Sequence, residues 1–135
     1  MKMITYTDGG ARGNPGPAAI GVVVKNAETG ANISAFGKYI GETTNNQAEY
    51  QALVAALETA LAHGATEVQC FLDSELIVKQ MNREYKVRDI GLQQHFLKVW
   101  NMAAGLKKCT FTHVPRAKNK EADAEVNKAL DARRY

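Results

Sequence analysis

Apolar and polar residues alternate in three short runs within the first forty residues, separated by turn-forming residues. A period of two places successive side chains on opposite faces of the backbone, which is typical of β-strands. We therefore expect strands over residues 2–8, 18–25 and 33–40, with connections short enough for an antiparallel meander. Gly9 and Gly10 are expected to break the first strand directly after Asp8.

Beyond residue 46 the apolar positions recur every three or four residues, which indicates amphipathic helices alternating with further strands. The first of these helices should cover residues 47–63, with Asn45 or Asn46 as its N-cap and Gly64 as its left-handed stop. The other predicted elements are a strand at 66–73, helices at 74–83 and 91–106, a strand at 107–115 and a helix at 119–133.

This order of elements predicts an α/β fold with a five-stranded mixed sheet and helices on both faces. The fourth strand follows a crossover helix, so it should run parallel to the first. The sequence contains no internal repeat, low-complexity segment or linker. Residues 1–135 are therefore expected to form a single domain, large enough to bury a core.

Composition and charge favour a soluble cytoplasmic protein. No apolar run reaches the roughly 20 residues that a membrane span needs, and Met1 leads directly into the first strand without a signal peptide. Cys70 and Cys109 lie in apolar stretches without metal-ligand spacing, so reduced thiols are expected, with a disulfide as the alternative. The net charge of +3 permits a polyanionic partner without requiring one.

Four acidic residues occupy positions that the apolar pattern assigns to the sheet or the core. Asp8 and Asp73 end the first and fourth strands, whose carboxyl ends meet at one edge if the strands are parallel neighbours. Glu49 and Asp123 lie on the apolar stripes of their helices. Each acid has an ordinary alternative, since Asp-Gly-Gly is common in turns and Glu49 would suit the first turn of a helix.

Together, four neighbouring carboxylates need an electrostatic explanation. A like-charge pair about 4 Å apart costs roughly 4 kcal/mol at an effective dielectric constant of about 20. Such a cluster either raises its pKa values or binds multivalent cations. Ligands that are all oxygen favour Mg²⁺, and two such ions are suited to in-line phosphoryl transfer.

Short motifs surround these acids in a fixed order along the chain. They are Asp8-Gly9-Gly10, Gly13-Asn14-Pro15-Gly16, Thr43-Thr44-Asn45-Asn46-Gln47-Ala48-Glu49, Leu72-Asp73-Ser74 and Asn119-Lys120-Glu121-Ala122-Asp123. In this order they resemble the motifs of type 1 ribonuclease H over nearly the whole chain. The resemblance implies a ribonuclease H-like fold and an endonuclease that hydrolyses the RNA strand of RNA–DNA hybrids.

The resemblance also implies the roles of individual residues. Asp8, Glu49, Asp73 and Asp123 match the carboxylates that hold two Mg²⁺ ions, with Asp8 shared and Mn²⁺ as a substitute metal; the products would carry 5′-phosphate and 3′-hydroxyl ends. The positions implied in binding the hybrid are Gly9, Gly10, Ala11, Arg12, Asn14, Asn45, Asn46, Gln47, Ser74, Lys86 and Asn119. A monomer is expected.

The sequence departs from the family pattern before the last acid. Many members carry a histidine in a mobile loop there, whereas this chain has a short loop that begins with Arg116. His113 falls on the predicted strand and is expected to be packed there. Arg116 is therefore the expected catalytic substitute, binding phosphate through its guanidinium group without acting as a base.

Three other functions remain open at this point. A phosphotransferase or ATPase would need a second lobe, and a silent nucleic-acid-binding module would be expected to lack at least one of the four acids. Activity on double-stranded RNA in addition to hybrids stays open because of the short loop and Arg116.

Overall fold

A computed structural model describes residues 1–133 and shows a five-stranded sheet in the order β3-β2-β1-β4-β5. β1 pairs with β2 in antiparallel fashion and with β4 in parallel, and β5 extends the parallel part. The predicted mixed sheet is therefore confirmed. The strands are β1 (Lys2–Ala11), β2 (Gly16–Asn26), β3 (Asn32–Thr43), β4 (Glu67–Leu72) and β5 (Lys108–His113).

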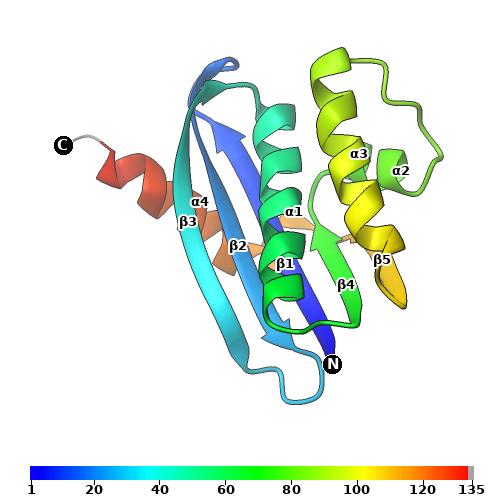
Figure 1. Ribbon diagram of the computed structural model, residues 1–135. Coiled ribbons are helices and arrows are strands. Elements are labelled where there is room, and N and C mark those ends of the chain that lie inside the picture. Colours follow the sequence, from blue (N-terminus) through cyan, green and yellow to red (C-terminus); the bar gives the residue numbers. More distant parts are fainter. Residues whose placement is uncertain (134–135) are drawn as a thin grey trace.

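Helices cover both faces of this sheet, as predicted (Figure 1). α1 crosses β1 and β2 on one face, with α2 and α3 beside it, while α4 lies on the opposite face across β1, β2 and β3. None of the described helices is both long and apolar enough to cross a bilayer. The helices are α1 (Asn45–Ala62), α2 (Glu75–Met81), α3 (Ile90–Ala104) and α4 (Lys120–Ala132), with a 3₁₀ turn, η1 (Arg116–Lys118), before α4.

The first strand does not break at the glycines, so that prediction is wrong. β1 continues to Ala11 because β2 pairs with it along this whole stretch, with Gly9 opposite Ile20. Its parallel neighbour β4 ends at Leu72, opposite Thr7. Asp8 is thus the first residue of β1 beyond the end of β4, which leaves its side chain at an open edge.

Gly9 permits a close approach of another backbone, which is the second role that glycine allows at this position. A Cβ atom at this position would collide with the backbone carbonyl of Ala48 in α1. The first turn of α1 therefore lies directly on β1, closer than any side chain would permit. This contact brings the helical residue after Ala48, which is Glu49, next to Asp8.

The start of α1 also differs from the prediction. β3 extends to Thr43, and Thr44 is the N-cap, with its Oγ1 accepting a hydrogen bond from the backbone N–H of Gln47 at 3.2 Å. Neither Asn45 nor Asn46 caps the helix, because both already lie within it. Gly64 does have the predicted left-handed conformation after the helix, with φ of 87°.

The core lies mainly between α1 and the sheet. Tyr50 of α1 is fully buried, and its hydroxyl donates a hydrogen bond of 2.7 Å to Oε1 of Gln80 in α2. Cys70 is buried and Cys109 is half-buried, and both are free thiols as expected. On the other face, α4 contributes Val126 and Leu130 to a smaller apolar cluster with Ala19.

The close contact at Gly9 can be tested by adding one methyl group. We expect Gly9→Ala to lower the free energy of unfolding by about 2 to 3 kcal/mol, because α1 must move away from β1. Gly10→Ala is the matched control, since its Cβ would lie in ordinary contact 3.9 Å from Val126. Urea unfolding followed by circular dichroism measures both. Equal midpoints for the two variants would contradict the close packing of α1.

Candidate active site

An open cleft of about 490 Å³ lies at the edge of the sheet where β4 ends. Its wall includes all four acids that the sequence singled out, together with Arg116. β1 contributes Asp8, α1 contributes Glu49, the residue after β4 is Asp73, and α4 contributes Asp123. Four separate elements therefore direct carboxylates into one hollow.

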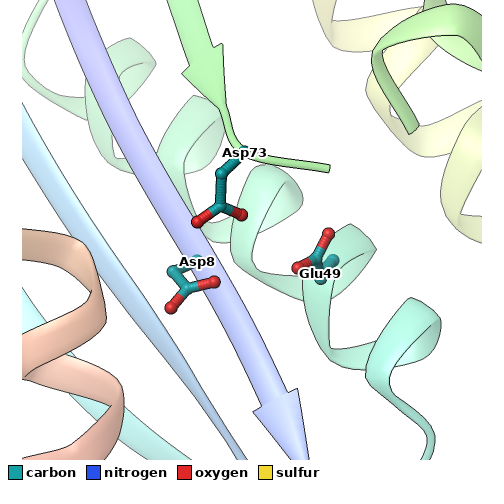
Figure 2. A group of neighbouring side chains, drawn as sticks. All are labelled: Asp8, Glu49 and Asp73. Atoms are coloured by element: carbon teal, nitrogen blue, oxygen red, sulfur yellow. The ribbon is translucent and has the colours of Figure 1, made fainter. Parts of the chain in front are cut away.

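Three of these carboxylates form a compact cluster (Figure 2). One oxygen from each of Asp8, Glu49 and Asp73 lies within 4.8 Å of the other two. The side chain of Asp73, directly after β4, points toward Asp8 of the neighbouring parallel strand β1, and Glu49 faces both from α1. This spacing allows one small cation to contact all three.

Burial makes the ionised form of the cluster costly. Desolvation, followed by the charges of Asp73 and Glu49, raises the pKa of Asp8 from 3.8 to about 8. Burial likewise raises the pKa of Glu49 to about 7, against the opposing effect of a hydrogen bond from Ser74. In the absence of a cation the cluster therefore retains protons near neutral pH.

Asp123 occupies the edge of the cluster instead of its centre. It lines the same cleft, and a hydrogen bond between Asp123 and Asp8 adds to the raised pKa of Asp8. It lies outside the group of three acids whose oxygens are all mutually close. Asp8 thus stands between Asp123 on one side and the pair Glu49 and Asp73 on the other.

Arg116 is a cationic residue that lines the cleft beside these acids. Its side chain is 83% exposed, and its Nη2 lies 3.7 Å from Oδ1 of Asp123. That distance leaves the guanidinium group available to another anion. His113 ends β5 and is exposed, so the expectation that it is packed on its strand is wrong. His113 does not belong to the residues that line the cleft.

Asn119 was predicted to contact substrate, but the structure places it in the interior. Its side chain is only 1% exposed, and its Nδ2 donates a hydrogen bond of 2.8 Å to the carbonyl oxygen of Thr7. This bond fixes the segment before α4 to β1, one residue before Asp8. Asn119 therefore positions Asp123 relative to Asp8, and its burial favours this structural role over direct contact with a duplex.

The loop after β1 is fixed to α1 by two asparagines. Asn45 Oδ1 accepts a hydrogen bond from the N–H of Ala11 at 2.8 Å, and Asn14 Oδ1 accepts one from the N–H of Asn45 at 3.0 Å. Arg12 forms an ion pair of 2.8 Å with Asp131 of α4. The cleft wall includes Gly9, Gly10, Ala11, Arg12 and Asn45 of the predicted binding residues.

The remaining predicted binding residues lie outside the lining of this cleft. Asn46 is exposed in the first turn of α1. Lys86 lines a separate hollow between α2 and α3. Gln47 faces α3, where its Oε1 lies 2.8 Å from Nε2 of His95. His95 carries no sequence signal for this contact, because the two residues are 48 positions apart.

Comparison with known proteins now gives this cleft a context. Residues 6–129 match the protein family described as reverse transcriptase-like. The chain is 43% identical to ribonuclease HI of Halobacterium salinarum over 96% of its length, covering 65% of that protein. It is 40% identical to a bifunctional protein of Mycobacterium tuberculosis over 98% of its length, but spans only 36% of that relative.

Solved structures agree with these sequence relationships. The crystal structure of RNase H1 from Halobacterium salinarum has a TM-score of 0.94 at 41% identity, with 98% of this chain and 99% of that chain covered. LC11-RNase H1 in complex with an RNA/DNA hybrid has a TM-score of 0.91 at 46% identity, with 97% and 98% covered. The fold and nearly the full length of these domains are therefore shared.

The raised pKa values predict how stability depends on pH. A group whose pKa is raised in the folded state stabilises that state at low pH, and this contribution is lost as the pH rises through the folded pKa. For Asp8 the loss should occur between its usual pKa of 3.8 and about 8. In EDTA we expect Asp8→Asn to be more stable than the wild type at pH 8, by on the order of 2 kcal/mol.

Mg²⁺ should stabilise the wild type at pH 8 and stabilise Asp8→Asn much less. Thermal unfolding of both proteins at several pH values, with EDTA or Mg²⁺, measures these differences. If the melting temperatures of the two proteins in EDTA changed with pH in the same way, the buried charge of Asp8 would not be what lowers stability at high pH.

Proposed function

Because this chain belongs to the type 1 ribonuclease H family, we propose that it hydrolyses the RNA strand of RNA–DNA hybrids in its acidic cleft. The observation that carries this proposal is the convergence of Asp8, Glu49 and Asp73, with oxygens within 4.8 Å of one another. The similarity to LC11-RNase H1, whose structure includes an RNA/DNA hybrid, supports the choice of substrate. A cleft of carboxylates does not attract a polyanion by itself, so a cation must take part.

The donor atoms of the cleft fit a hard divalent cation. Asp8, Glu49 and Asp73 offer only carboxylate oxygens, which suits Mg²⁺, with Mn²⁺ as a substitute. These three residues would hold one ion, and Asp8 with Asp123 would hold a second. When bound, two such ions supply activation of the attacking water and stabilisation of the leaving oxygen.

The protein's own groups prepare the site for this reaction. A hydrogen bond from Ser74 lowers the pKa of Glu49 and so favours its ionised form, against the effect of burial. Asp8 and Glu49 release their retained protons when a cation replaces them, because the cation favours the ionised form. Arg116, exposed beside Asp123, contacts a phosphate of the strand being cleaved. The products carry 5′-phosphate and 3′-hydroxyl ends.

Recognition of RNA belongs to the loop that follows Asp8. Gly9, Gly10 and Ala11 line the cleft, which supports the proposal that their backbone groups contact 2′-hydroxyl groups, the feature that distinguishes RNA from DNA. The two hydrogen bonds that connect Ala11, Asn45 and Asn14 hold this loop in shape. Asn14 and Asn46 are proposed to face the minor groove, and Lys86 the DNA strand. The free thiols of Cys70 and Cys109 favour a reducing compartment such as the cytoplasm.

A panel of duplexes tests the proposed activity. RNA–DNA, RNA–RNA and DNA–DNA duplexes with one labelled strand are incubated with Mg²⁺, Mn²⁺ or EDTA, and the fragment ends are mapped. We expect cleavage of the RNA strand of the hybrid with either metal and none in EDTA. The RNA–RNA duplex decides whether double-stranded RNA is a second substrate. Cleavage of DNA–DNA, or cleavage that survives EDTA, would overturn the proposal.

A pair of variants within α1 serves as the control for this panel. Glu49→Gln should lower kcat by about a hundredfold or more, because it removes a charged metal ligand. Glu58→Gln changes the same type of residue farther along α1, away from the cleft, and should leave kcat within about twofold.

The role of Arg116 has its own test. We expect Arg116→Ala to lower kcat/KM by about 10- to 100-fold, because it removes a charge-assisted contact to phosphate. Arg116→Lys should recover part of this loss, since a point charge remains without the bidentate geometry. Steady-state cleavage of a hybrid measures both variants. An unchanged rate for Arg116→Ala would assign this residue to the solvated surface.

A further inference from the structure

The face of the sheet opposite α1 is only partly covered. Within the described residues, α4 crosses β1, β2 and β3 on this face, where Glu125 packs on Gly37 near the middle of β3, and leaves most of β4 and β5 without a covering helix (Figure 1). Side chains of β1 and β4 that alternate with the buried ones therefore face solvent here. This bare area begins directly beside the acidic cleft, because Asp8 and Asp73 are the next residues on the same face of the two strands.

Two aromatic rings lie side by side on this bare face. Tyr6 of β1 and Phe71 of β4 are partners in the parallel register, and both are half-buried. Their ring centroids are 5.3 Å apart and their planes differ by 22°. We refer to Tyr6 and Phe71 as the aromatic platform. The two rings are stacked on each other, so each covers one face of its partner, and the Tyr6 ring also lines a hollow beside the pair. Aromatic side chains on a sheet are the groups on which RNA-binding domains stack unpaired bases.

A hollow of about 340 Å³ lies beside the platform and is rich in lysine. Tyr6 forms one wall, and Lys25, Lys118 and Lys120 line the others. Its acidic residue, Glu121, is neutralised by an ion pair of 3.0 Å with Lys25. The salt bridges of residues 1–133 include no partner for Lys118 or Lys120. The hollow therefore combines an aromatic surface with two positive charges that no acid of the described residues neutralises.

The short η1 segment separates this hollow from the acidic cleft. Arg116, its first residue, lines the cleft, whereas Lys118, its last, lines the hollow. Tyr6 precedes Asp8 by two residues on the same face of β1, a distance of about 7 Å along the strand. A nucleic-acid strand that leaves the cleft across η1 would therefore enter the hollow directly.

We propose that the aromatic platform and its lysines bind unpaired nucleotides that flank the duplex in the cleft. A base stacks on Tyr6, which Phe71 supports from its other side, while the phosphates contact Lys118 and Lys120. Two features together favour this ligand: the Tyr6 ring that lines the hollow suits a base, and the unpaired lysines suit a polyanion. The proposal extends the proposed function, because it assumes that the bound strand continues into the cleft.

Binding in EDTA tests the site without turnover. The wild type is titrated into fluorescently labelled RNA–DNA hybrids that are blunt, carry an unpaired uridine overhang at either end of the RNA strand, or carry an overhang of abasic residues with the same charge. We expect one uridine overhang to tighten binding about five- to tenfold, the lower end of the effect of one stacked base, and the abasic overhang to tighten it much less.

Variants locate the effect on the protein. Tyr6→Leu should abolish the advantage of the uridine overhang, whereas Tyr6→Phe should keep it, because only the ring is needed. Lys118→Glu changes an exposed side chain and should weaken the uridine-overhang and abasic-overhang hybrids alike. Lys38→Glu is its matched control on β3, where Lys38 lines a hollow beside α1 on the other face, and should not reduce the advantage of an overhang.

The outcomes separate this inference from the proposed function. If blunt hybrid is cleaved with Mg²⁺ but no overhang improves binding, the platform is not a nucleotide site and the nuclease proposal stands. If uridine and abasic overhangs increased the affinity equally, bases would not be stacking on the protein, and the proposal would also be wrong. The proposed site would likewise be wrong if Lys38→Glu removed the overhang effect as fully as Lys118→Glu. If overhangs improve binding and no hybrid is cleaved, the nuclease proposal fails while the nucleotide site remains.

Discussion

The mutual repulsion of buried carboxylates is the constraint on which the rest of this structure depends. Asp8, Glu49 and Asp73 are close enough for desolvation and like charge to raise the pKa of Asp8 to about 8. A chain free to relax would separate these groups, because each charge is more stable in water than beside another. The fold prevents this separation, since each acid is attached to an element whose position is fixed by other contacts.

Those contacts are short and few, and they join elements far apart in the chain. Gly9 lets α1 lie directly on β1, which holds Glu49 at the cleft. The hydrogen bond from Asn119 to the carbonyl of Thr7 holds the start of α4, and with it Asp123, against the same strand. Asp73 directly follows Leu72, the last residue of β4, and the pairing of β4 with β1 is enough to fix its position. Apolar packing supplies the stability of the fold, and these few contacts determine where the acids lie within it.

Much of this arrangement could be predicted from the sequence, because it follows from alternation and from the order of the elements. The parallel pairing of β1 with β4, and hence the meeting of Asp8 and Asp73, needs only the crossover rule. What could not be predicted depends on atoms far apart in the chain. The continuation of β1 past Gly9 requires β2 as a partner, and the burial of Asn119 requires the carbonyl of Thr7. Likewise, nothing near Gln47 in sequence indicates its contact with His95 of α3.

The distribution of charge follows from the same constraint. A cleft of carboxylates repels the phosphates of a nucleic acid until protons or cations neutralise it, so the cleft cannot supply the initial attraction. With several acids gathered there, the rest of a chain of net charge +3 is more basic than that total suggests. Arg116 and Lys118 place positive charge on both sides of η1, at the border of the cleft. Attraction of a polyanion to this border and neutralisation of the cleft are therefore separate steps, with different dependence on salt and on divalent cations.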